Sequence, residues 1–133
     1  MIAQIDDAAL ATALRNCDLP VVNVGNCEML AEYPYVGNDV QATANQAFEH
    51  FYALGFRHVA YLGAKNCPTS RELGERFAAC ARRMDVDCCT FQAEVAQANA
   101  PFATVIGVLR GFPRPSGVLA DSAQSGRRLR GWG

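Results

Sequence analysis

Amphipathic stretches and short apolar runs alternate along this chain. Between Asp39, a good helix N-cap, and Gly55, a glycine placed for a left-handed C-cap, apolar residues recur three and four positions apart. They are Ala44, Ala47, Phe48, Phe51 and Tyr52. Residues 58–62 are then apolar and β-prone, and a short strand is expected at Tyr35. A helix between two short strands indicates parallel pairing of those strands in an open α/β sheet.

The same alternation covers the rest of the chain. Further helices are expected near 7–16, 70–84 and 102–111, and further strands near 1–5, 20–24, 87–91 and 117–120. The expected apolar helix faces are Ala9, Leu10, Ala13, Leu14 and Cys17; Leu73, Phe77, Cys80, Ala81 and Met84; and Phe102, Val105, Ile106 and Leu109. Thr69 and Glu72 match the T-x-x-E pattern of a capping box. The order predicts an α/β fold of parallel sheets flanked by helices.

Composition and charge exclude several classes of protein. Half of the 133 residues are hydrophobic, and the net charge is −1. A domain that binds the phosphate backbone strongly is usually basic, so this segment is not expected to bind DNA by itself. No apolar run approaches the roughly 20 residues of a membrane helix. The start, MIAQIDDAAL, lacks the basic and apolar regions of a signal peptide. We therefore expect no membrane partner and a cytoplasmic location.

The cysteines and histidines form no recognisable reactive or metal-binding motif. The cysteines are Cys17, Cys27, Cys67, Cys80, Cys88 and Cys89. They contain no CxxC pair, and His50 and His58 complete no zinc pattern. Reduced cysteines acting as small hydrophobes are expected, with a disulfide or metal role as the alternative. Structural roles are expected for both histidines. No G-x-G-x-x-G, P-loop or G-x-S-x-G motif supports a nucleotide cofactor or a hydrolase, so we expect no cofactor.

Four segments carry a family resemblance. They are LPVVNVG at 19–25, AFEHFYALGFRHVAYLG at 47–63, SRELGERFAA at 70–79 and RPSGVLADS at 114–122. In this order and spacing they resemble the effector-binding core of LacI/GalR-type transcriptional regulators, in particular the xylose-regulator-like branch. The resemblance implies a fold like that of periplasmic sugar-binding proteins, in which two α/β subdomains close around a small ligand.

The resemblance also divides the chain. Residues 1–33 resemble the end of the N-terminal effector subdomain, and residues 34–133 the first part of the C-terminal one. The first strand has no upstream partner, the helix from Ser122 has no return strand, and a helix-turn-helix has no counterpart here. We therefore expect a fragment of a longer regulator. By resemblance that regulator is a homodimer, its effector is a sugar, specifically a pentose, and DNA is bound only through the absent domain.

The candidate ligand-binding residues lie after the carboxyl ends of the expected strands, where open α/β sheets hold ligands. They are Asp39, Thr69, Ser70, Arg71 and Asp121. Carboxylates and a planar guanidinium suit the hydroxyls of a sugar. For Asp39 the alternative is a helix cap only, and for Thr69, Ser70 and Arg71 it is a capping box beside a solvated arginine. Two positions depart from the family pattern, because relatives have arginine where Leu73 stands and aspartate where Ala123 stands.

Three functions remain open on this basis. The resemblance favours a sugar-sensing fragment of a transcriptional regulator. The alternatives are a solute-binding or flavodoxin-like module outside transcription, and a fragment of an α/β enzyme. Since no catalytic constellation is present, an enzyme is not expected.

Overall fold

The chain folds into two compact units, Met1–Asp39 and Val40–Gly133. The computed structural model describes residues 2–3, 7–24, 30–65, 67–93, 100–114, 116–122, 126–127 and 129–130. The division falls after Asp39, later than the subdomain boundary expected after residue 33. Assignment of the units to the two effector subdomains stays a prediction.

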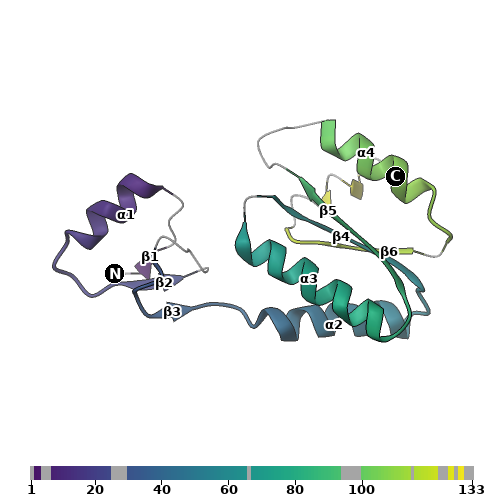
Figure 1. The fold of residues 1–133 in the computed structure, drawn as a ribbon, viewed down its shortest axis with the longest axis horizontal. Helices are drawn as coiled ribbons and strands as arrows, with labels where there is room; N and C mark the ends of the chain where they lie inside the picture. Colours follow the sequence, from purple (N-terminus) through teal and green to yellow (C-terminus); the bar gives the residue numbers. More distant parts are fainter. Residues whose placement is uncertain are drawn as a thin grey trace. The chain divides into compact units, whose positions relative to one another are not determined.

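The first unit is a small parallel sheet with one helix. Its elements are β1 (Ile2–Ala3), α1 (Ala8–Arg15), β2 (Val22–Val24) and β3 (Tyr35–Val36), with strand order β1-β2-β3 (Figure 1). The Asp7 side chain caps α1 by accepting from the Ala9 amide at 2.8 Å. Ala11 and Leu14 of the helix pack with Val21 and Leu30.

Two expectations for this unit are wrong. Tyr35 pairs with Asn23 of β2, so β3 belongs to the first sheet and does not pair with the strand at 58–62. A strand of two exposed residues carries no hydrophobic pattern that would identify its sheet. The apolar face of α1 also differs from the expected one. Its buried residues are Ala11 and Leu14, whereas Leu10 is 52% exposed, because a helix of eight residues buries only a narrow stripe.

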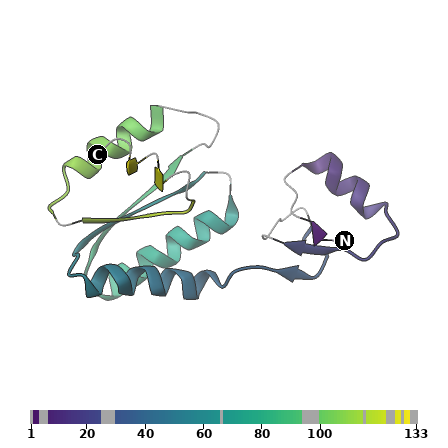
Figure 2. The same cartoon turned by 180° about the vertical axis from the view of Figure 1, so that it is seen from behind.

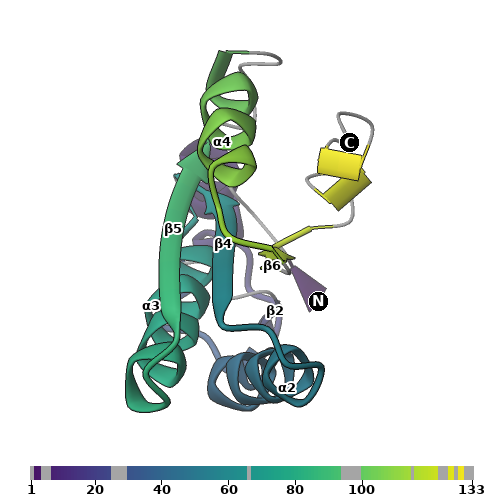
Figure 3. The ribbon, with the colours of Figure 1, turned by 90° about the vertical axis from the view of Figure 1, so that its right-hand side faces the viewer.

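The second unit is an α/β sandwich. Its elements are α2 (Val40–Ala53), β4 (His58–Ala64), α3 (Pro68–Arg83), β5 (Asp87–Ala93), α4 (Ala100–Arg110) and β6 (Ser116–Ala120). The strand order is β5-β4-β6, and both pairings are parallel, as expected (Figure 2). The helices α2 and α3 lie side by side (Figures 1 and 3). Within the described residues, every helix and strand expected up to residue 120 is found within a few residues of its expected position. The helix expected from Ser122 falls largely outside the described residues.

Helices cover both faces of the second sheet. Successive side chains of β4 point to opposite faces, so the strand contributes to the core on each side. Val59 and Tyr61 pack in the core with α2 and α3, whereas Leu62 packs with Val105 of α4. Phe77 of α3 is fully buried at the centre of the larger core. Its ring lies 6.2 Å from those of Phe48 and Phe51 and 6.4 Å from that of Tyr61, centre to centre.

The ends of the helices agree with the sequence-based expectations at the end of α2 but not at the two ends of α3. Gly55 has a φ of 85°, as expected for a left-handed C-cap of α2. The capping box at Thr69 is wrong: α3 begins at Pro68, and Cys67 is the N-cap without a side-chain bond. Proline favours the first helical position, so it places Thr69 inside the first turn. Met84 follows α3 and is 46% exposed, so it does not extend the apolar face.

Within the described residues, every helix is too short or too polar to cross a lipid bilayer.

Candidate functional site

A hydrogen-bonded cluster lies at the carboxyl ends of β4 and β6. The Asp121 amide donates to the Leu62 carbonyl at 3.0 Å, which extends the β4–β6 ladder by one residue beyond the end of β6. The Asp121 side chain then reaches across the end of β4. Its Oδ2 accepts from the Ala64 amide at 3.0 Å and from Ser70 Oγ at 2.8 Å. This aspartate thereby joins β6, β4 and the first turn of α3.

Tyr61 supports this cluster from inside the core. Its hydroxyl donates to the Ser70 carbonyl at 2.7 Å and lies 2.9 Å from Ser70 Oγ. The single Ser70 proton points to the Asp121 carboxylate, and Tyr61 directs its own single proton to the Ser70 carbonyl, with the Ser70 hydroxyl oxygen beside it. Burial is the main cause that raises the pKa of Tyr61 to about 12. The tyrosine is therefore a neutral donor at physiological pH.

Two glycines allow this close packing. A Cβ on Gly63 would lie 2.5 Å from Ser70 Oγ and 2.6 Å from the Tyr61 ring. Gly74 lies in α3, one helical turn after Ser70. A Cβ on Gly74 would lie 2.6 Å from two atoms of the same ring. These Cβ distances are all shorter than a normal contact between two atoms. Tyr61 can therefore occupy its position only because residues 63 and 74 are glycines.

Two groups in the second unit predict a loss of stability in alkali. Burial is also the main cause that raises the pKa of Cys88 to about 11, from an ordinary value of 9.0. Both this thiol and Tyr61 are thus neutral in the fold, and both favour the unfolded state once deprotonated. We expect constant stability up to about pH 9, then a decline as pH rises through about 11 and 12. Urea unfolding across this range measures it, and Cys88→Ala should remove the earlier part of the decline.

The candidate residues do not all meet in one place. Ser70 and Asp121 are bonded to each other, and Thr69 lies half-buried in the same helical turn. Arg71 is exposed and lines a groove of about 330 Å³ between α3 and β5. Asp39 is exposed and ends the first compact unit, so its role as a ligand residue stays a prediction. Ala123 lies outside the described residues.

The groove beside Arg71 has polar and apolar groups in its lining. From α3 it receives Arg71, Glu75 and Arg82, and from β5 it receives Cys88, Thr90 and Gln92. Side chains of this kind can bind the hydroxyls of a small polar molecule. The groove lies between α3 and β5, an edge strand of the described sheet, and the spacing of residues along the chain did not indicate it.

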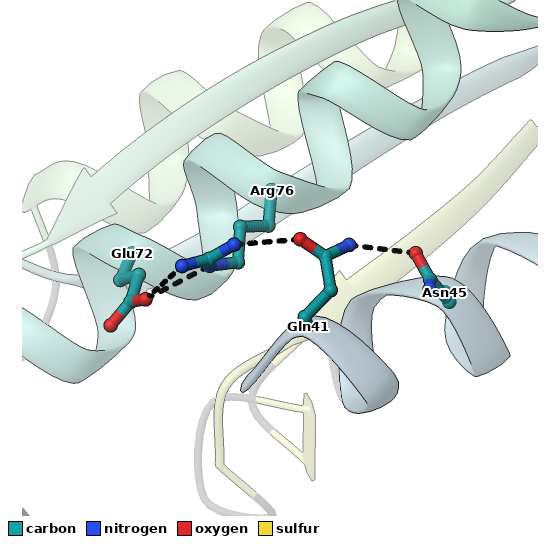
Figure 4. Close-up of polar contacts among 4 residues, drawn as sticks. All are labelled: Gln41, Asn45, Glu72 and Arg76. Atoms are coloured by element: carbon teal, nitrogen blue, oxygen red, sulfur yellow. Dashed lines mark hydrogen bonds and ion pairs between the residues drawn. The ribbon is translucent and has the colours of Figure 1, made fainter. Parts of the chain in front are cut away.

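A separate polar cluster lies where α3 packs against α2 (Figure 4). Arg76 donates to Glu72 Oε1 at 2.9 and 2.7 Å and to Gln41 Oε1 at 2.7 Å, and Gln41 donates to Asn45 at 2.8 Å. Gln41 lies in the first turn of α2, so the cluster fixes the start of that helix against α3. Its members are satisfied by one another, which favours a structural role.

The expected structural role of His58 agrees with its surroundings. Its Nδ1 lies 3.1 Å from Asp87 Oδ2 on the neighbouring strand, where the two residues are in register. The pair lies at the amino ends of β4 and β5, opposite the end that carries Ser70 and Asp121. Asp87 was missed as a partner because strand register is not visible in the spacing along the chain.

Comparison with known proteins identifies relatives for this fold. No protein-family model matches the chain. It is 35% identical over 80 residues to the xylose operon regulatory protein of Escherichia coli strain K12, which is 57% of this chain and 20% of that regulator. The structure of the xylose-binding transcription activator xylR superposes on 96% of the chain with a TM-score of 0.71 and 28% identity. The chain is similar in sequence and in fold to xylose regulators of the LacI/GalR type.

Other regulators share the fold at lower identity. A LacI transcriptional regulator from Lactobacillus brevis covers 92% of the chain with a TM-score of 0.72 and 20% identity. These results confirm the resemblance to LacI/GalR-type regulators and the periplasmic-binding-protein-like fold. The relatives are named as transcription regulators. This chain corresponds to only part of each of them, from 20% of the E. coli regulator to 36% of xylR and 48% of the L. brevis protein.

Proposed function

We propose that this chain is the sugar-sensing part of a LacI/GalR-type transcriptional regulator and that its effector is a small neutral sugar, D-xylose or a similar pentose. The observation that carries the proposal is the similarity, in sequence and in fold, to regulators named for xylose. DNA binding and dimerisation belong to the whole regulator and not to this segment alone. The slight net negative charge of the segment agrees with that division of roles.

The sugar site is proposed at the carboxyl ends of the strands of the second unit. Ser70, Arg71 and Asp121 stand there, with Thr69 in the same turn of α3. In open α/β folds, ligands bind at this end of the sheet, which supports the placement. Asp39 is proposed as a sugar contact from the segment that precedes α2. Since this segment is part of a two-subdomain core by resemblance, the isolated chain is expected to bind sugar weakly.

The exposed guanidinium of Arg71 gives a direct test of the site. In a hybrid in which this chain replaces the matching segment of a complete xylose regulator, Arg71→Ala should lower D-xylose affinity about tenfold, the loss of one or two good hydrogen bonds. Titration calorimetry measures the affinity. The matched control is Arg110→Ala, which removes an exposed arginine in the last turn of α4 and should leave the affinity unchanged.

The departure at Leu73 provides the opposing outcome. The family resemblance implies arginine at that place, and Leu73 is a half-buried residue of α3 packed against the core. Unchanged affinity in Arg71→Ala, together with tighter binding in Leu73→Arg, would show that the ligand-binding arginine has been assigned to the wrong position.

A further inference from the structure

Asp121 has the geometry of a connecting residue. Its backbone is held by β4 through the Leu62 carbonyl, and its Oδ2 atom accepts from two donors, one at the end of β4 and one in α3. These donors, the Ala64 amide and the Ser70 hydroxyl, lie 57 and 51 residues away in sequence. The end of β6 is thereby tied to the last residue of β4 and to the first turn of α3.

We propose that Asp121 is a positioning residue of the sugar site, which acts through Ser70 and does not itself contact the sugar. This rests on the proposed function for the identity of the ligand. The geometry of the hydrogen bonds stands independently of the ligand. In this role, Asp121 fixes the first turn of α3, which carries Thr69 and Arg71.

The direction of the hydrogen bonds supports this role. Ser70 is only 6% exposed, and its one proton is directed to Asp121 while its oxygen accepts from the Ala64 amide at 2.9 Å. Tyr61 donates toward the same serine from the core. Ser70 is thus used within the protein, whereas the next residue, Arg71, is exposed. Loss of the acceptor would leave a buried hydroxyl without its partner and loosen this turn.

The choice of substitution separates positioning from contact. Asparagine has an amide oxygen that can accept from both Ala64 and Ser70, so Asp121→Asn preserves the connection. Leucine has a similar shape and no acceptor, so Asp121→Leu removes it. A sugar hydroxyl that donates to the carboxylate would in contrast be affected by both variants, because the charge is lost in both.

The test is amide hydrogen exchange at Ala64 in the full chain, measured by NMR together with a D-xylose titration at millimolar concentrations. In Asp121→Leu, exchange at Ala64 should be at least about tenfold faster than in wild type, and in Asp121→Asn it should be close to wild type. D-xylose affinity should fall about fivefold in Asp121→Leu and stay within about twofold in Asp121→Asn.

Ser70→Ala combined with Asp121→Leu should weaken binding no further than Asp121→Leu alone. Asp87→Leu removes an exposed carboxylate at the other end of the sheet and should change neither quantity.

Two results would overturn the proposal. If Asp121→Asn weakens D-xylose binding as much as Asp121→Leu while Ala64 stays protected, Asp121 contacts the sugar. If Ala64 exchanges equally fast in wild type and Asp121→Leu, the connection does not hold the turn. A wild-type chain that shows no D-xylose binding, even within the hybrid regulator, contradicts the proposed function, and the exchange rates then still decide the positioning role.

Discussion

Phe77→Ala is expected to lower the free energy of unfolding of the second unit by about 3–5 kcal/mol. Phe77 is fully buried, and its ring is surrounded by those of Phe48, Phe51 and Tyr61. Its removal leaves a cavity that two helices and the central strand must share. A loss of this size is a large fraction of the roughly 5–15 kcal/mol by which native domains are stable. Urea unfolding followed by far-UV circular dichroism measures it.

The control for this prediction is Met84→Ala, in the residue that follows α3. Because Met84 is 46% exposed, its truncation should change stability by no more than about 0.5 kcal/mol. Equal effects of the two substitutions would contradict the assignment of Phe77 to the centre of the core.

Gly74→Ala is expected to destabilise the second unit although alanine favours helices. The new Cβ would lie 2.6 Å from two atoms of the Tyr61 ring, which is buried and held by its bonds to Ser70. Overpacking of this kind costs about 1–3 kcal/mol. The gain in helix propensity, about 1 kcal/mol, does not offset the upper part of that range.

Gly107→Ala is the matched control, since Gly107 is also a helical glycine, in α4. A Cβ added at Gly107 would meet no described atom within 4 Å, so alanine should stabilise the unit by about 0.5–1 kcal/mol. The two alanine variants should thus shift the urea midpoint in opposite directions. A stabilising Gly74→Ala would show that Tyr61 is not packed as described.

Local patterns were sufficient for the elements of the second unit. The spacing of Phe48, Phe51 and Phe77 predicted the buried faces of α2 and α3, apart from Met84, because long helices repeat their apolar stripe several times. The elements of the first unit are too short for an apolar pattern to repeat along them. The sheet to which Tyr35 belongs and the buried face of α1 therefore depended on tertiary contacts that the sequence does not show.

The site was predictable in part. The position of Ser70 and Asp121 after two adjacent parallel strands brought them to one edge of the sheet, as the topology requires. The bond between them, the participation of the Ala64 amide and the donor role of Tyr61 were not foreseen. A tyrosine within a buried apolar strand was the available signal, since its hydroxyl needs a partner there.

The most direct test of the central claim is operator binding by a hybrid regulator in which residues 1–133 replace the matching segment of the E. coli xylose operon regulatory protein. The account predicts that D-xylose changes the affinity of the folded hybrid for its operator, as measured by fluorescence anisotropy alongside the parent protein. A folded hybrid that binds the operator equally well with and without D-xylose, while the parent responds, would contradict the account.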